Sequence, residues 1–74
     1  MGHITKTVTL SGGSPTSIED AIGTVLGRAA ETIADIERFE VVSIDGAVDR
    51  AGVPSEFHVT LDITFAVKES PTHD

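Results

Sequence analysis

The side chain best suited to acid–base chemistry is His58. The alternation of apolar and polar residues near the end of the chain places it on the polar face of a strand, beside Thr60 and Asp62. A His imidazole is the side chain that most often serves as a general acid or base. Nucleophilic catalysis would also require a Ser or Thr held against it in a pocket, and no nucleophile elbow or signature loop is present. We therefore expect that the protein is not an enzyme. The alternative is an enzyme whose activity depends on His58. His3 and His73 lie near the ends of the sequence and are expected to be exposed.

Arg38 is the second side chain with chemical potential. A guanidinium can pair with an anionic ligand or stack on a planar one. A simpler role is an ion pair within the chain, with the nearby Glu37 or Glu40. A third possible role is a pair with a neighbouring subunit. The sequence leaves these alternatives open.

The glycine pair Gly12-Gly13 could suggest a loop that cradles a phosphate. A Walker loop, however, ends in Gly-Lys-Ser/Thr, and a dinucleotide-binding turn needs three spaced glycines. Neither pattern occurs here, so we expect residues 11–15 to form an ordinary turn.

Composition narrows the classes of function. The 74 residues carry twelve Asp and Glu against five Lys and Arg, a net charge of −7, which argues against a nucleic-acid partner. The absence of Cys removes disulfides and thiolate metal sites. One domain, residues 1–74, is expected, with 1–3 and 70–74 frayed. Such a small chain needs a metal or copies of itself for stability. No apolar run is long enough to cross a membrane and no secretory signal is evident, so we expect a cytoplasmic protein.

Four elements must position these side chains. Alternation predicts strands over residues 3–10, 37–49 and 57–67, and the consecutive Val41 and Val42 predict a bulge in the second strand. A helix is predicted over residues 17–35, with Thr16 or Ser17 as its N-cap. Gly23 and Gly27 lie on one side of it, which favours a tight contact with the sheet over a seam between two helices.

The order strand, helix, strand, strand predicts an α+β fold of β-α-β-β type. In it a three-stranded antiparallel sheet wraps one helix. The last strand is longer than one helix-covered layer requires, and the sheet edges would stay exposed. The elements therefore favour a homo-oligomer on physical grounds.

The whole pattern resembles the dodecin family, small proteins that assemble as hollow spherical dodecamers. The resemblance covers residues 4 to 69 and rests on Val8–Pro15, Ala29–Ile33, Phe39–Val41, Gly46, Ala51–Val53 and Glu56–Phe65. It implies a homododecamer that is not an enzyme. It also implies that this assembly binds a flavin (riboflavin or FMN) where subunits meet.

The flavin-binding residues of the family do not carry over. Arg38 stands where the family has a Trp that stacks on the flavin ring, and His58 stands where a Gln binds its polar edge. Asp45 and Ala66 replace basic residues found in members that bind phosphorylated flavin. The resemblance therefore implies a pocket lined by Arg38, His58 and Asp45, with flavin binding weakened or lost. A typical flavin store and a structural shell without a ligand are the alternatives.

A branch of the family that lacks the Trp is described as calcium-binding, and residues 14–17 and 47–52 resemble it. Calcium takes six to eight oxygen ligands, and carboxylates supply them. The candidates are Asp45, Asp49, Glu56 and Asp62, although Asp45–Asp49 lacks the spacing of an EF-hand loop. A closed shell of such acidic chains would concentrate cations. The competing interpretation is that these acids are surface charge that keeps the assembly soluble.

Overall fold

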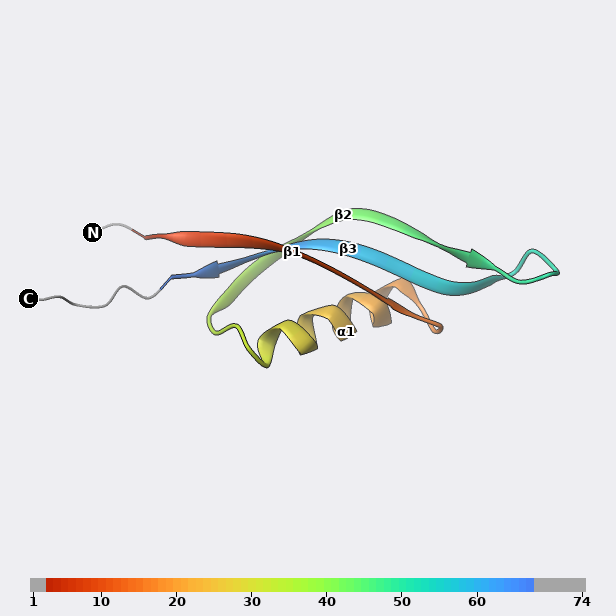
Figure 1. Ribbon diagram of the computed structural model, residues 1–74, viewed down its shortest axis with the longest axis horizontal. Helices are drawn as coiled ribbons and strands as arrows, with labels where there is room; N and C mark the ends of the chain where they lie inside the picture. Colours follow the sequence, from red (N-terminus) through yellow and green to blue (C-terminus); the bar gives the residue numbers. More distant parts are fainter. Residues whose placement is uncertain (1–2, 68–74) are drawn as a thin grey trace, which may run out of the picture.

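The computed structural model describes residues 3–67. Its elements follow the order β1 (Thr5–Ser14), α1 (Ile18–Ala30), β2 (Ile36–Val48) and β3 (Pro54–Ala66), with the helix lying under one face of the sheet (Figure 1). The predicted β-α-β-β architecture with a three-stranded antiparallel sheet is confirmed. Residues 70–74, which were predicted to fray, lie outside the described part, and so does His73. His3 is exposed, as predicted, and contacts Glu37. Among residues 3–67, no helix has the length and apolar content needed to span a bilayer.

The central strand is β3, which pairs antiparallel with β1 on one side and β2 on the other. The predicted bulge is confirmed, because the register of β2 shifts between Val41 and Ser43. Two further shifts, at Ile36/Arg38 and Ala47/Val48, were not predicted. These irregularities increase the local twist and let the long hairpin curve around the helix.

The turn predicted over residues 11–15 is wrong, because β1 continues through both glycines to Ser14. Gly12 pairs with Val59 beneath the helix, and a Cβ at Gly12 would lie 2.8 Å from Cγ2 of Val25. The glycine therefore serves close packing between helix and strand rather than a change of chain direction.

The helix ends at Ala30 and not at residue 35 as predicted. The N–H groups of Glu31 and Thr32 donate to carbonyls three residues back, which closes the last turn tightly. Asp35 then takes a left-handed conformation, with φ of 62°, and leads into β2. Ile33 packs against the core from the connection, which is why the apolar spacing continues past the end of the helix.

The N-terminus of the helix follows the sequence expectation. Ser17 is the N-cap, and its hydroxyl accepts a hydrogen bond of 2.9 Å from the Asp20 N–H. The Asp20 carboxylate in turn accepts a 2.6 Å bond from the buried Ser14 hydroxyl, which ties the end of β1 to the first turn of the helix.

The core lies where the helix crosses the sheet. Small helix residues allow a close approach to the middle of β3, and the fully or almost fully buried apolar residues are Ala21, Val25, Ala29, Val59, Leu61 and Ile63. At Gly23 and Gly27, in contrast, a Cβ would meet nothing within 4 Å. The prediction that these two glycines make a tight contact with the sheet is therefore wrong.

The sheet is much longer than the helix that covers it. Helix α1 has 13 residues and spans about 20 Å, whereas the 13 residues of β3 span about 43 Å. The β2–β3 hairpin consequently extends beyond the helix (Figure 1). The radius of gyration is 16.2 Å, against about 11 Å for a compact domain of this length. Apolar side chains on the uncovered ends, such as Val48 and Val53, remain exposed.

Candidate functional site

The face of the sheet turned away from the helix carries the polar side chains predicted to bind ligands. Because Val59, Leu61 and Ile63 are buried on the helix side, the alternating residues of β3 point to the other side. We call this the polar face. Its rows, read across β1, β3 and β2, are Thr7–Thr64–Arg38, Thr9–Asp62–Glu40, Ser11–Thr60–Ser43 and Gly13–His58–Asp45.

One end of the polar face gathers three candidate residues. His58 Nδ1 lies 3.6 Å from Asp45 Oδ1, an ion pair whenever the imidazole is protonated. Glu56 reaches the same place, since its Oε2 lies 2.8 Å from the position that a Gly13 Cβ would occupy. Gly13 therefore leaves room for the carboxylate, and His58 Cδ2 lies 3.4 Å from that same position. We call Asp45, Glu56 and His58 the hairpin cluster.

The hairpin cluster borders a shallow groove of about 290 Å³. Asp45 and Glu56 line it together with apolar residues of the hairpin, among them Ile44 and Phe57. Two carboxylates beside an open groove can bind a cation if further oxygen ligands approach from outside.

The two other predicted metal ligands lie elsewhere. Asp49 closes the hairpin turn, where its Oδ1 accepts hydrogen bonds from the N–H groups of Ala51 and Val53 at 2.9 and 3.0 Å. Asp62 accepts a 2.6 Å bond from the Thr9 hydroxyl in the middle of the polar face. Within residues 3–67 of one chain, no three His, Asp or Glu side chains come together in a geometry that could hold a metal. One chain thus unites only part of the predicted calcium set.

The role of Asp49 in the turn gives a first prediction. Replacing Asp49 with alanine removes both bonds to the turn and should lower the free energy of unfolding by about 1–2 kcal/mol. Asp49→Asn keeps an acceptor oxygen at the same place and should retain most of that stability. Urea denaturation of both variants checks this, and equal losses would show that the carboxylate acts through its charge and not through these bonds.

Arg38 and His58 do not share a pocket within one chain. Arg38 pairs in register with Thr64, six positions along β3 from His58, which corresponds to about 20 Å. Arg38 forms no ion pair or side-chain hydrogen bond among the described residues. The ion pair with Glu37 or Glu40 is therefore not formed, and Glu37 instead lies 3.1 Å from His3. A pocket with both Arg38 and His58 requires more than one chain.

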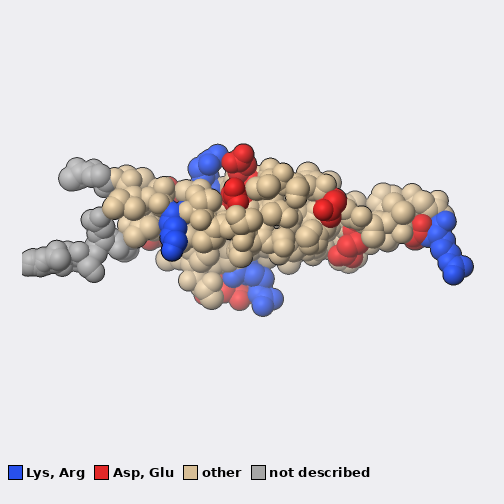
Figure 2. All heavy atoms as spheres, turned by 45° about the horizontal axis from the view of Figure 1, so that its top comes forward, with Lys and Arg blue, Asp and Glu red and all other residues tan. Residues whose placement is uncertain are grey.

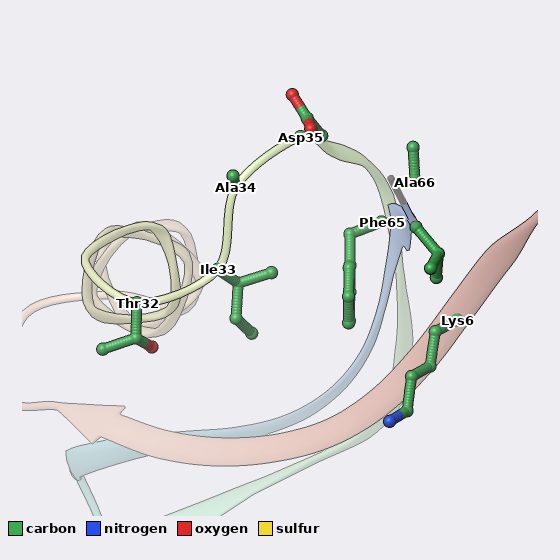
Figure 3. Close-up of a pocket in the computed structure, with 8 residues that line it drawn as sticks. Lys6, Thr32, Ile33, Ala34, Asp35, Phe65 and Ala66 are labelled. Carbon is green, nitrogen blue, oxygen red and sulfur yellow. The ribbon is translucent and has the colours of Figure 1, made fainter. Parts of the chain in front are cut away.

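A larger groove, which the sequence reasoning missed, lies beyond the end of the helix. It has a volume of about 480 Å³, and Figure 3 shows Ile33, Phe65 and Lys6 extending toward the same space while the Asp35 carboxylate points away from it. We call it the helix-end groove; its lining residues are Lys6, Thr32, Ile33, Ala34, Asp35, Phe65, Ala66 and Val67. The sequence feature that could have indicated this groove is Lys6, because this charged residue interrupts the apolar residues on the helix side of β1.

Comparison with known proteins shows that this chain is similar to the members of one protein family. The family model described as Dodecin matches residues 4–68. Dodecin of Thermus thermophilus is 39% identical over 70 residues, which cover 95% of this chain and all of that protein. Calcium dodecin of Mycobacterium tuberculosis is 33% identical over 63 residues, covering 85% and 87% of the two chains.

Solved structures of both relatives share the fold. A crystal structure of a T. thermophilus dodecin variant superposes with a TM-score of 0.86 at 39% identity and covers 93% of this chain and 100% of the other. The structure of M. tuberculosis calcium dodecin, described with a novel calcium-binding site, gives 0.74 at 31% identity, with 95% and 99% covered.

Proposed function

Because the chain belongs to the dodecin family, we propose that it acts as a non-enzymatic homo-oligomer that binds a small ligand or a cation, with calcium as the cation. The observation that carries this proposal is the hairpin cluster, where Asp45 and Glu56 stand beside an open groove. In an assembly of twelve copies, symmetry would bring further carboxylates to such sites and supply the oxygen ligands that one chain lacks. Calcium binding by the M. tuberculosis relative supports the choice of ion.

The polar face supports a cation better than a flavin. All three phenylalanines, Phe39, Phe57 and Phe65, stand in rows that face the helix side, and the chain has no Trp or Tyr. No copy of this chain therefore offers a Phe, Tyr or Trp ring on the polar face for a flavin to stack on, a contact typically worth about 1–3 kcal/mol per ring. The Arg38 guanidinium can stack instead, so flavin remains the alternative ligand.

Calcium should stabilise the protein. At a free concentration about 100-fold above the dissociation constant, a bound ion raises the free energy of unfolding by about 2.7 kcal/mol. We expect heat on titration with calcium and a higher melting temperature in calcium than in chelator. The double variant Asp45→Asn/Glu56→Gln should lose both effects, whereas Glu19→Gln on the exposed side of the helix should keep them.

Two measurements separate the alternatives. Quenching of riboflavin or FMN fluorescence at nanomolar concentrations would favour a flavin store, and no response to calcium or flavin would leave a structural shell.

Light scattering should give about twelve times the mass of one chain, and a stable monomer would refute the proposed assembly. A cytoplasmic location stays a prediction.

A further inference from the structure

The uncovered ends of the sheet are a groove at one end and a projecting hairpin at the other. At one end the sheet extends past Ala30 and forms the helix-end groove, and at the other the hairpin around residues 44–57 projects past the start of the helix. We propose that the projecting hairpin of one copy seats against the helix-end groove of another copy and that, when no calcium is bound, Lys6 of the groove pairs there with Glu56 of the hairpin. This inference rests on the self-assembly proposed above and names the surfaces that form it.

The apolar parts of the two ends match. The walls of the groove include Ile33, Phe65 and Val67, the last of which is 38% exposed. On the hairpin, Val48 is 65% and Val53 is 55% exposed. Covering both surfaces at once removes apolar area from water that a lone chain leaves exposed.

The charges match as well. Lys6 has no ion pair or side-chain hydrogen bond among the described residues. The hairpin carries Asp45, Asp49 and Glu56 against Arg50 alone. Figure 2 shows acidic side chains along the projecting end and a basic one beside an acidic one at its tip. An unpaired ammonium at the edge of an apolar groove therefore fits a partner surface with a net negative charge.

Within one chain the proposed pair cannot form. Lys6 lies opposite Phe65 in the register, and Glu56 lies nine positions further along β3, a separation of about 30 Å. Any energetic coupling between Lys6 and Glu56 must therefore pass between copies. Because the groove and the hairpin are different surfaces, the contact is of the head-to-tail kind, which closes into a ring when the rotation between copies permits.

A charge-swap cycle tests the contact. Lys6→Glu and Glu56→Lys should each lower the melting temperature of the assembly by about 4–8 °C, the shift expected for a loss of about 1 kcal/mol per chain. The double variant Lys6→Glu/Glu56→Lys should recover most of this loss. The matched control, Arg28→Glu/Glu56→Lys, has the same net charge of −7 as the double variant but should show no recovery, because Arg28 lies on the helix beside Glu31. All measurements use chelator, so that loss of a bound cation does not contribute.

The outcomes distinguish this contact from the assembly itself. Additive effects in an intact oligomer would overturn the pairing of Lys6 with Glu56 and leave the proposed assembly standing. A wild-type monomer in solution would overturn both. If Lys6→Glu does not fold, the neutral variants Lys6→Gln and Glu56→Gln give the same cycle, in which the double variant should lose no more than either single one.

Discussion

Replacing Gly46 with alanine should disrupt the outer half of the β2–β3 hairpin and lower the free energy of unfolding by about 3 kcal/mol or more. A Cβ at Gly46 would run into the carbonyl oxygen of Glu56 on the neighbouring strand, with the Glu56 carbonyl carbon and the Phe57 Cα close behind. All three are backbone atoms, so no side-chain rotation relieves the collision. The strands would have to separate, and the hairpin cluster on either side of Gly46 would separate with them. Calcium binding should therefore be lost together with stability.

The chain supplies a matched control for this prediction. Gly27 is exposed on the helix, and a Cβ there would meet nothing within 4 Å, so Gly27→Ala should stabilise by up to about 1 kcal/mol through helix propensity alone. The same chemical change is thus expected to act in opposite directions at the two sites. Thermal denaturation and calcium titration of both variants check this. A Gly46→Ala protein as stable as the parent would contradict the register between β2 and β3.

The second large effect is expected at the centre of the core. Leu61 is fully buried on β3 beneath the helix, between Leu10 of β1 and Val41 of β2. Leu61→Ala removes the packing that holds helix and sheet together and should cost about 2–5 kcal/mol, because the surroundings cannot collapse into the space.

Leu10→Ala is the control for Leu61→Ala. Leu10 belongs to the same cross-strand row but is 36% exposed, so the same truncation should cost clearly less. Urea denaturation at fixed protein concentration measures both variants. A loss at Leu61 no larger than that at Leu10 would contradict the position of the core.

The element order could be predicted from the sequence because each element has its own period. Alternation from Phe57 to Val67 identified β3, and the capping residues Thr16 or Ser17 marked the start of the helix, which the structure places at Ser17. The predicted end of the helix was wrong because Ile33 continues the helical spacing although it packs from a loop. Gly12 and Gly13 were interpreted as a turn, since a local pattern does not show that the helix lies directly over that strand.

The candidate site was predictable only in part. The alternation of β3 correctly placed His58 and Asp62 on one face, but the distance between Arg38 and His58 depends on the pairing register with β2, which no local pattern gives. Asp49 and Glu56 looked equivalent as carboxylates flanking a turn. The structure separates them, because Asp49 holds the turn through backbone N–H groups while Glu56 reaches toward Gly13.

The central position of β3 has a consequence for how the chain acquires its structure during synthesis. Within the part of the chain that the structure describes, β1 and β2 pair only with β3, which follows both of them in the sequence. Until β3 has left the ribosome, neither strand has its partner, and the helix has no buried surface of β3 to cover. We therefore expect the emerging chain to stay largely without a sheet until its last strand is available, and then to fold in one cooperative step dominated by contacts distant in sequence.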